Sequence, residues 1–153
     1  MDFEALASFI LEAKARCYVG GGTLLSLRPG SHDIGHSHGE WFYLDSYFGG
    51  TDFAGQEVVW LAGQPVWAMN YFGRITDPAR IDASRAGAVI KAALSRLYAE
   101  EGRFLGGTDF RHDFGRYIDR SSGDTLSFSG REVILVDDVE AYDLDYRGGL
   151  IKA

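Results

Sequence analysis

Residues 43–73, YLDSYFGGTDFAGQEVVWLAGQPVWAMNYFG, contain three strand-like runs separated by two glycine-containing turns. Side chains along the runs alternate with the two-residue period of a β-strand. The same pattern returns 75 residues later in the chain. The recurring pairs are Phe53 and Phe128, Gly55 and Gly130, Glu57 and Glu132, Trp67 and Tyr142, Tyr71 and Tyr146, and Gly73 and Gly148.

Upstream of this stretch the offset becomes 76 residues, which we attribute to one residue lost in an intervening turn. The pairs there are Asp33 and Asp109, His36 and His112, Gly39 and Gly115, and Trp41 and Tyr117. The sequence therefore predicts an internal duplication, with repeats at about residues 3–73 and 80–148. A chain of 153 residues has the size of one domain, so we expect both repeats within a single domain, 1–153.

Apolar residues at three- and four-residue steps predict two helices. The first covers residues 3–17, with Asp2 as its N-cap and the glycines at 20–22 as its end. The second begins at Asp77-Pro78, because a capping residue followed by proline is typical of a helix start, and it ends before Gly102.

Three strands are expected after each helix. In the first repeat they follow the runs at 41–47, 57–61 and 66–72, and a shorter strand is expected at 23–27. In the second repeat they lie near Tyr117, at 131–136 and at 141–147. Because tight turns join them, most pairs should be antiparallel.

The predicted fold class is α+β, an internally duplicated helix–three-strand unit. Two helices should pack on a mostly antiparallel sheet of about six strands, with a pseudo-two-fold axis relating the halves. The pattern leaves open whether the sheet is continuous or closes into a half-barrel.

Composition restricts the partners. The net charge of −7 disfavours nucleic acid, which binds clustered Lys and Arg, and it disfavours anionic membrane surfaces. No run approaches the length of a membrane span, and the acidic N-terminus is unlike a signal peptide. Cys17 is alone, so no intramolecular disulfide forms. We expect a cytoplasmic protein.

Four long motifs resemble a bacterial family of domains of unknown function. They are DSYFGG at 45–50, FAGQEVVW at 53–60, PVWAMNYFG at 65–73 and YRGGLI at 146–151. Members of this family stand alone or follow a helix-turn-helix DNA-binding domain, and the second arrangement implies a role in sensing or interaction. This chain has no DNA-binding segment, and the resemblance supplies no catalytic residues.

The segment 32–40 contains a cluster of metal-ligand types: His32, Asp33, His36, His38 and Glu40. Imidazoles and carboxylates bind zinc, but a Gly- and Ser-rich loop positions ligands poorly. We therefore predict a solvated polar loop, with no metal and no cofactor.

Glu57 and Glu132 begin strands that are otherwise apolar. A buried carboxylate there could have a raised pKa and act as an acid or base. Because the residue occurs in both repeats, the structural interpretation is favoured, in which each carboxylate is satisfied by a donor.

Polar and aromatic side chains on neighbouring strands could line a pocket with apolar walls and a few polar anchors, or could form an aromatic core. The candidate ligand-binding residues are Asp45, Tyr47, Glu57, Trp60, Trp67, Asn70 and Tyr71. No catalytic residue is predicted, since Ser46 and Cys17 lack a nucleophile signature.

The strand 66–72 lacks a polar side. Val66, Ala68 and Phe72 oppose its core face, so the segment 23–31, a second subunit or a ligand near Asn70 should cover them. We therefore predict a non-enzymatic module that senses a small ligand or binds a protein, with a small molecule or a homodimer as its partner. The alternatives are a small metal- or carboxylate-dependent hydrolase that uses segment 32–40, and a purely structural subunit.

Overall fold

The computed structural model describes residues 1–20, 22–25 and 27–152. Gly21, predicted at the end of the first helix, and Ser26, within the predicted strand 23–27, lie outside the described residues. The elements are α1 (Phe3–Val19), β1 (Thr23–Leu25), β2 (His32–His38), β3 (Trp41–Gly49), β4 (Asp52–Leu61), β5 (Gln64–Ile75), α2 (Ala83–Ser95), the π-helical turn η1 (Arg96–Glu100), β6 (Thr108–His112), β7 (Gly115–Asp124), β8 (Ser127–Val136) and β9 (Val139–Leu150).

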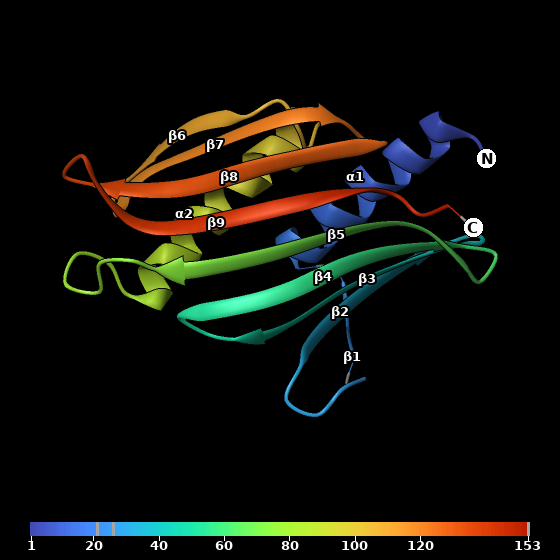
Figure 1. Ribbon diagram of the computed structural model, residues 1–153, viewed down its shortest axis with the longest axis horizontal. Coiled ribbons are helices and arrows are strands. Elements are labelled where there is room, and N and C mark those ends of the chain that lie inside the picture. Colours follow the sequence, from blue (N-terminus) through green and yellow to red (C-terminus); the bar gives the residue numbers. More distant parts are fainter. Residues whose placement is uncertain (21, 26, 153) are drawn as a thin grey trace.

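The described strands form one antiparallel sheet of nine strands, in the order β1-β2-β3-β4-β5-β9-β8-β7-β6 (Figure 1). Two meanders, β2–β5 and β6–β9, meet where β5 pairs with β9. The prediction of about six strands is therefore wrong, and each helix is followed by more than three strands. The sheet is continuous, which answers the question that the sequence left open.

The two strands that the sequence did not predict, β2 and β6, are short or polar. β2 reads HDIGHSH and β6 reads TDFRH, and both are poor in the β-branched residues that mark strands. β2 is the segment 32–40 that was expected to be a loop. Seven successive pairs with β3 hold it in the sheet, so tertiary pairing overrides its weak propensity.

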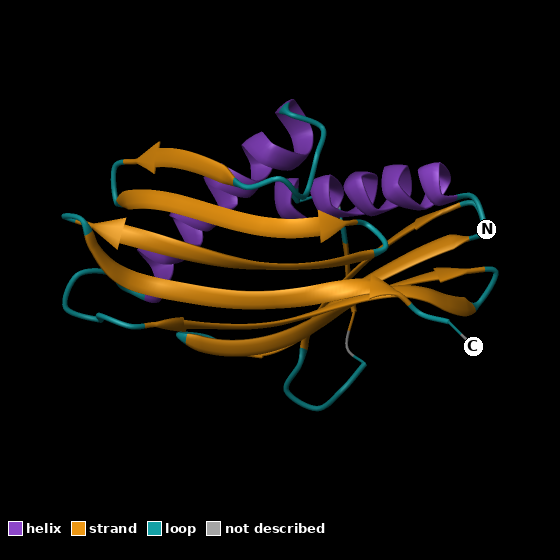
Figure 2. Ribbon diagram, turned by 45° about the horizontal axis from the view of Figure 1, so that its top comes forward, coloured by secondary structure: helices purple, strands orange, loops and turns teal. Residues whose placement is uncertain are grey.

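Both helices lie on one face of the sheet, here called the inner face (Figure 2). α1 packs on β2 and β3, whereas α2 packs on β6 and β7. The inner face carries the aromatic core, including Tyr43, Trp67 and Tyr142, all of which are buried. Among the described residues, no helix is long and apolar enough to cross a membrane.

The strand registers correct the upstream offset. Tyr43 pairs with Val59, and Tyr117 pairs with Ile134, which lies 75 residues after Val59. Tyr117 therefore occupies the place of Tyr43, not of Trp41, so the upstream offset is 74 and not 76. The turn before Phe128 is one residue longer than its counterpart, which is the opposite of the predicted loss. The duplication at 3–73 and 80–148 stays a prediction, which these matching registers favour.

The ends of α1 follow the expected rules. The Asp2 carboxylate accepts hydrogen bonds from the Glu4 and Ala5 amides at 3.0 and 3.1 Å, and Gly20 ends the helix with φ 102°. The start of α2 was misplaced. Asp82 caps it, whereas Asp77 accepts a hydrogen bond from the Ala79 amide within a turn. The segment at 77–78 thus forms a turn that precedes the helix.

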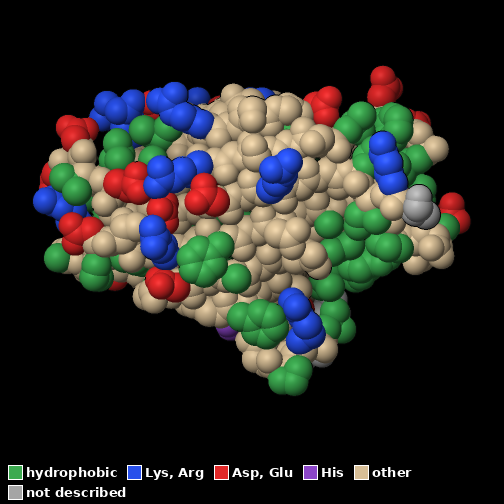
Figure 3. Space-filling view, viewed as in Figure 1, with side chains coloured by type: hydrophobic (Ala, Val, Ile, Leu, Met, Phe, Trp, Pro, Cys, Tyr) green, Lys and Arg blue, Asp and Glu red, His purple; other side chains and the backbone are tan. Residues whose placement is uncertain are grey.

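Figure 2 shows both described helices on the inner face, and Figure 3 looks onto the opposite face, here called the outer face. Phe72 is 52% exposed there and Val66 is half-buried, so the segment 23–31 leaves Phe72 uncovered. That segment instead shields Ser46, whose hydroxyl accepts a hydrogen bond from Arg28. Asp143 is buried on the outer face by Arg74 and Arg131, each of which approaches its carboxylate to 3.0 Å.

Two tyrosines cross the sheet over glycines. Tyr71 on β5 lies over Gly55 on β4, and its hydroxyl donates to Asp45 on β3 at 2.6 Å. Tyr146 lies over Gly130 in the same way, and its hydroxyl donates to Asp119 at 2.8 Å. A Cβ at either glycine would overlap the tyrosine ring, so the hydrogen bond across the middle strand requires glycine there.

We expect Gly55→Ala to lower the free energy of unfolding by about 1–3 kcal/mol, because the new methyl group displaces Tyr71 from Asp45. Urea denaturation measures the change. The matched control is Gly87→Ala in α2, where a Cβ meets nothing within 4 Å. It should raise stability by about 0.5–1 kcal/mol through helix propensity. Equal effects of the two substitutions would contradict this role for Gly55.

Candidate functional site

A cavity of about 390 Å³ lies between the inner face and the helices. Its exposed lining residues are at the β3–β4 turn, Gly49, Gly50 and Thr51, and in the first half of α2, Ala83 and Gly87. These residues form its mouth. The buried lining residues lie deeper, on β3, β4, β5, β8 and β9, on η1 and on the inward side of α2. The volume is within the range of about 300–1,000 Å³ that small-molecule sites occupy.

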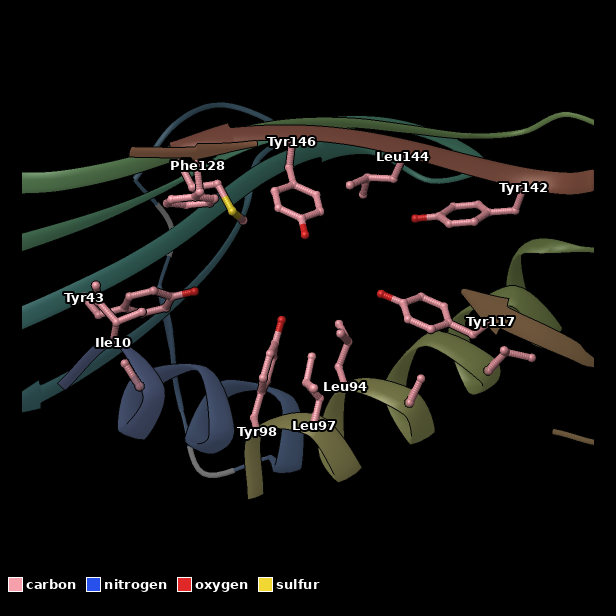
Figure 4. Close-up of a cluster of buried hydrophobic side chains, with 14 of the residues drawn as sticks. Ile10, Tyr43, Leu94, Leu97, Tyr98, Tyr117, Phe128, Tyr142, Leu144 and Tyr146 are labelled. Atoms are coloured by element: carbon pink, nitrogen blue, oxygen red, sulfur yellow. The ribbon is translucent and has the colours of Figure 1, made fainter. Parts of the chain in front are cut away.

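Aromatic rings form much of the cavity wall. They belong to Tyr18, Tyr47, Phe53, Tyr71, Tyr98 and Tyr142. Figure 4 shows the hydroxyls of Tyr98 and Tyr142 directed into the space between the sheet and the helices. Tyr142 is 1% exposed, and its hydroxyl has no hydrogen-bond partner among the described residues. The buried hydroxyls of Tyr43 and Tyr117 also lack a partner among the described residues, but neither lines the cavity. Tyr142 is therefore distinguished by its place in the cavity wall, where a bound molecule can reach its hydroxyl.

Three carboxylates also line the cavity: Asp45, Glu57 and Glu132. Glu57 is buried and paired with Lys14 of α1, whose Nζ lies 2.8 Å from Oε1 and 2.6 Å from Oε2. The same ammonium lies 5.4 Å from the centroid of the Tyr98 ring, within cation–π range. Glu57 therefore has a counterion within the fold.

Among the described residues, Asp45 has no such counterion. Burial first, and then the negative charge of Glu57, raise the pKa of Asp45 to about 7, although the hydrogen bond from Tyr71 opposes the rise. Burial and the charge of Asp119 raise the pKa of Glu132 to about 8. Both groups therefore titrate in the physiological pH range.

The second meander carries a related set of groups. Asp119, Glu132 and Tyr146 correspond in register to Asp45, Glu57 and Tyr71. Burial raises the pKa of Asp119. The space next to this second set measures only about 20 Å³, because the side chains of Lys14, Leu97 and Phe104 occupy the region. The open cavity thus lies beside the set of the first meander, and Glu132, Tyr142 and Leu144 of the second meander complete its wall.

A family model described as "Domain of unknown function (DUF5680)" matches residues 45–151. The chain belongs to this family. The expected membership in a family of domains of unknown function is therefore confirmed. Asp45, Glu57 and Glu132 lie inside the part that matches DUF5680, whereas Lys14 precedes it. Nothing among the curated proteins or the solved structures matches the chain.

Four of the seven residues predicted to bind a ligand lie together in this DUF5680 chain. Asp45, Tyr47, Glu57 and Tyr71 all line the cavity. Their side chains share the inner face because they occupy positions of the same parity in paired strands.

The other three predicted residues lie elsewhere. Trp60 and Asn70 are on the outer face, where Trp60 contacts Phe42 and Asn70 accepts a hydrogen bond from Gln56 at 2.9 Å. Trp67 is on the inner face but packs on Phe128 away from the cavity. The prediction grouped neighbouring residues of opposite parity, such as Asn70 and Tyr71, which a strand must place on opposite faces.

Two histidines of segment 32–40 contact Glu12, a residue that was not among the candidates predicted from the sequence. The two carboxylate oxygens of Glu12, on α1, contact His36 Nε2 at 2.8 Å and His38 Nδ1 at 2.9 Å. These hydrogen bonds, that of His38 foremost, lower the pKa of Glu12. In the part of the chain that the structure describes, no group of His, Cys, Asp and Glu is arranged to hold a metal ion.

Lys14, Tyr98 and Tyr142 were not recognised as site residues. Lys14 follows Ile10 by four positions, so the helical period placed it on the apolar face of α1. A lysine on that face requires a buried partner, and Glu57 was already marked as a buried carboxylate. The sequence identified Tyr142 as the counterpart of Trp67, but the lack of a partner for its hydroxyl among the described residues depends on three-dimensional packing.

Lys14→Met should lower the free energy of unfolding by about 3–5 kcal/mol, because Glu57 would remain buried without a counterion. The double variant Lys14→Met/Glu57→Gln should recover most of the loss. Lys91→Met, at an exposed position on α2, is the matched control and should be nearly neutral. Urea denaturation of the four proteins measures these changes. A double variant as unstable as the single one would show that the ion pair is not the cause.

Asp45→Asn should stabilise the protein at alkaline pH. The pKa of Asp45 is raised in the folded state, so the folded protein binds this proton more tightly than the unfolded chain does. The stability that this proton contributes is complete below the unfolded pKa and is lost as the pH rises through about 7. At about pH 8.5 the variant should exceed wild type by on the order of 1–3 kcal/mol.

Urea denaturation at about pH 5.5 and about pH 8.5 tests this expectation. Asp145→Asn, on the exposed outer face, is the control and should follow wild type. If Asp45→Asn also follows wild type at both pH values, the carboxylate does not carry the pH dependence.

Proposed function

We propose that this domain is a non-enzymatic ligand-binding module that holds a small molecule in the cavity between the inner face and the helices. The observation that carries the proposal is the cavity itself, about 390 Å³ with a mouth between the β3–β4 turn and α2. The partnerless buried hydroxyl of Tyr142 in its wall supports the same conclusion, because a ligand can supply the missing hydrogen bond.

The side chains around the cavity favour binding over catalysis. Cys17 lines the cavity, but burial raises the pKa of its thiol to about 12, so the nucleophilic thiolate is scarce at neutral pH. Ser46 is on the outer face, where its hydroxyl donates to Asp33. Hydrogen bonds from Ser31 and Ser46 lower the pKa of Asp33 to about 2, so this carboxylate is too weak a base to activate Ser46.

The alternative of a hydrolase that uses segment 32–40 has less support. His36 and His38 are hydrogen-bonded to Glu12, and neither lines the cavity. His32 stacks on Tyr47 with a centroid distance of 4.9 Å and is exposed. These contacts stabilise the packing of α1 and β3 against β2, which is a structural role.

Titration with N-phenyl-1-naphthylamine, a neutral apolar dye that becomes fluorescent in apolar sites, tests the proposed function. We expect saturable binding to wild type. Ala83→Trp, which places a large side chain at the mouth, should weaken binding by about tenfold or more. Ser84→Trp, at the next position and outside the lining, should bind like wild type. Absence of saturable binding, or equal affinities in all three proteins, would contradict the proposal.

A further inference from the structure

The charges of the cavity wall are all of one sign. Asp45, Glu57 and Glu132 line it, whereas no Lys, Arg or His does so among the described residues. Lys14 lies just behind the wall, and its ammonium is bound to Glu57. Within the described residues Lys14 is the one buried basic side chain, so Asp45 and Glu132 share no second cation. The described part of the wall therefore lacks a positive charge to pair with Asp45 and Glu132.

The aromatic rings favour the same kind of ligand. Tyrosine and phenylalanine faces attract cations through the ring quadrupole, and this attraction grows where water is excluded. The fold already uses this chemistry once, since the Lys14 ammonium lies 5.4 Å from the Tyr98 centroid and 5.7 Å from the Phe104 centroid. Tyr98 also lines the open cavity. The lysine is thus an internal example of a cation held by a carboxylate and aromatic rings.

A second observation is independent of the carboxylates. The Tyr142 hydroxyl, almost completely buried and without a partner in the described part of the chain, points into the same space (Figure 4). An alkylammonium group donates hydrogen bonds, and a phenolic oxygen can accept one. The site therefore offers a neutral acceptor in addition to its carboxylates.

Resting on the proposed function, we infer that the cavity binds a small organic cation, an ammonium group on an apolar body, with the charge held by Asp45 and Glu132 among the tyrosine rings. The apolar body fits the remaining wall, which Ile34, Ile75, Ile90 and Leu94 provide. The same wall disfavours an anionic ligand, because it would meet Asp45 and Glu132, with which no basic side chain of the described residues pairs. The charge of Glu57 beside them is already offset by Lys14.

Binding of this cation is coupled to proton release. Free Asp45 and Glu132 are partly protonated near neutral pH, and a bound cation stabilises their ionised forms. Affinity for the cation should therefore rise with pH.

The titratable groups around Asp45 come from several elements of the fold. They are Lys14, Cys17 and Tyr18 from α1, Asp33 from β2 across the sheet, Tyr43 and Tyr47 from β3, Glu57 from β4, Tyr71 from β5, Tyr98 from η1, Glu132 from β8 and Tyr142 from β9. α2 adds none to the cavity lining.

Two ligands of nearly identical shape separate charge from size. Benzyltrimethylammonium is a cation without an N–H group, so it tests the charge and not the hydrogen bond to Tyr142, and neopentylbenzene replaces its nitrogen with carbon. Isothermal titration at about pH 6 and about pH 8.5 should show that the cation binds wild type about tenfold or more tightly than the neutral compound. The preference should increase at the higher pH. Asp45→Asn should reduce this preference by about tenfold, and Asp145→Asn should leave it unchanged.

The outcomes distinguish the two proposals. If both compounds bind equally at both pH values, the inference of a cationic ligand fails and the proposed binding function stands. If neither binds, and the neutral dye does not bind either, the proposed function fails as well. Binding of neopentylbenzene by Asp45→Asn serves as the check that the variant is folded. Should that variant not fold, the pH dependence of the preference in wild type decides the question.

Discussion

Four carboxylates lie between the sheet and the helices, and one lysine ammonium lies among them. Asp45, Glu57, Asp119 and Glu132 are each at most 9% exposed, and Lys14 is 1% exposed. A buried charge without a partner is among the most costly features that a fold can contain. The arrangement of α1, η1 and the inner face follows from this constraint. Lys14 reaches Glu57 from α1, and the tyrosines donate to the two aspartates.

Asp45 and Asp119 each accept a hydrogen bond from a tyrosine, in an arrangement that occurs once in each meander. In each meander a tyrosine on the last strand, β5 or β9, lies over a glycine of the neighbouring strand. Its hydroxyl donates a hydrogen bond to an aspartate two strands away. This one tyrosine side chain thereby links three neighbouring strands. Beside the second meander, Lys14 of α1, Leu97 of η1 and Phe104 line a space of only about 20 Å³, whereas beside the first the corresponding space remains open. Related backbones therefore support a packed core on one side and a cavity on the other.

Much of the fold was predictable, and the failures have identifiable causes. The long apolar strands and α1 were found because their periods and caps are strong signals, as Asp2 and Gly20 illustrate. β2 was missed because its His, Ser and Gly residues have weak strand propensity, which seven pairs with β3 override. Glu57 was recognised as a buried carboxylate, but its partner on α1 depends on how the helix crosses the sheet. Trp60 and Asn70 were assigned to the site because strand parity was not applied to them.

The buried carboxylates would also make the stability of the folded domain depend on the inferred cation. Asp45 and Glu132 destabilise the empty domain at neutral and alkaline pH, so any cation that enters the cavity offsets that cost as well as filling space. The fraction of molecules that are unfolded, and hence open to proteases, would then decrease as the cation accumulates. If the inferred cation binds, the abundance of the domain in a cell would follow the concentration of that cation.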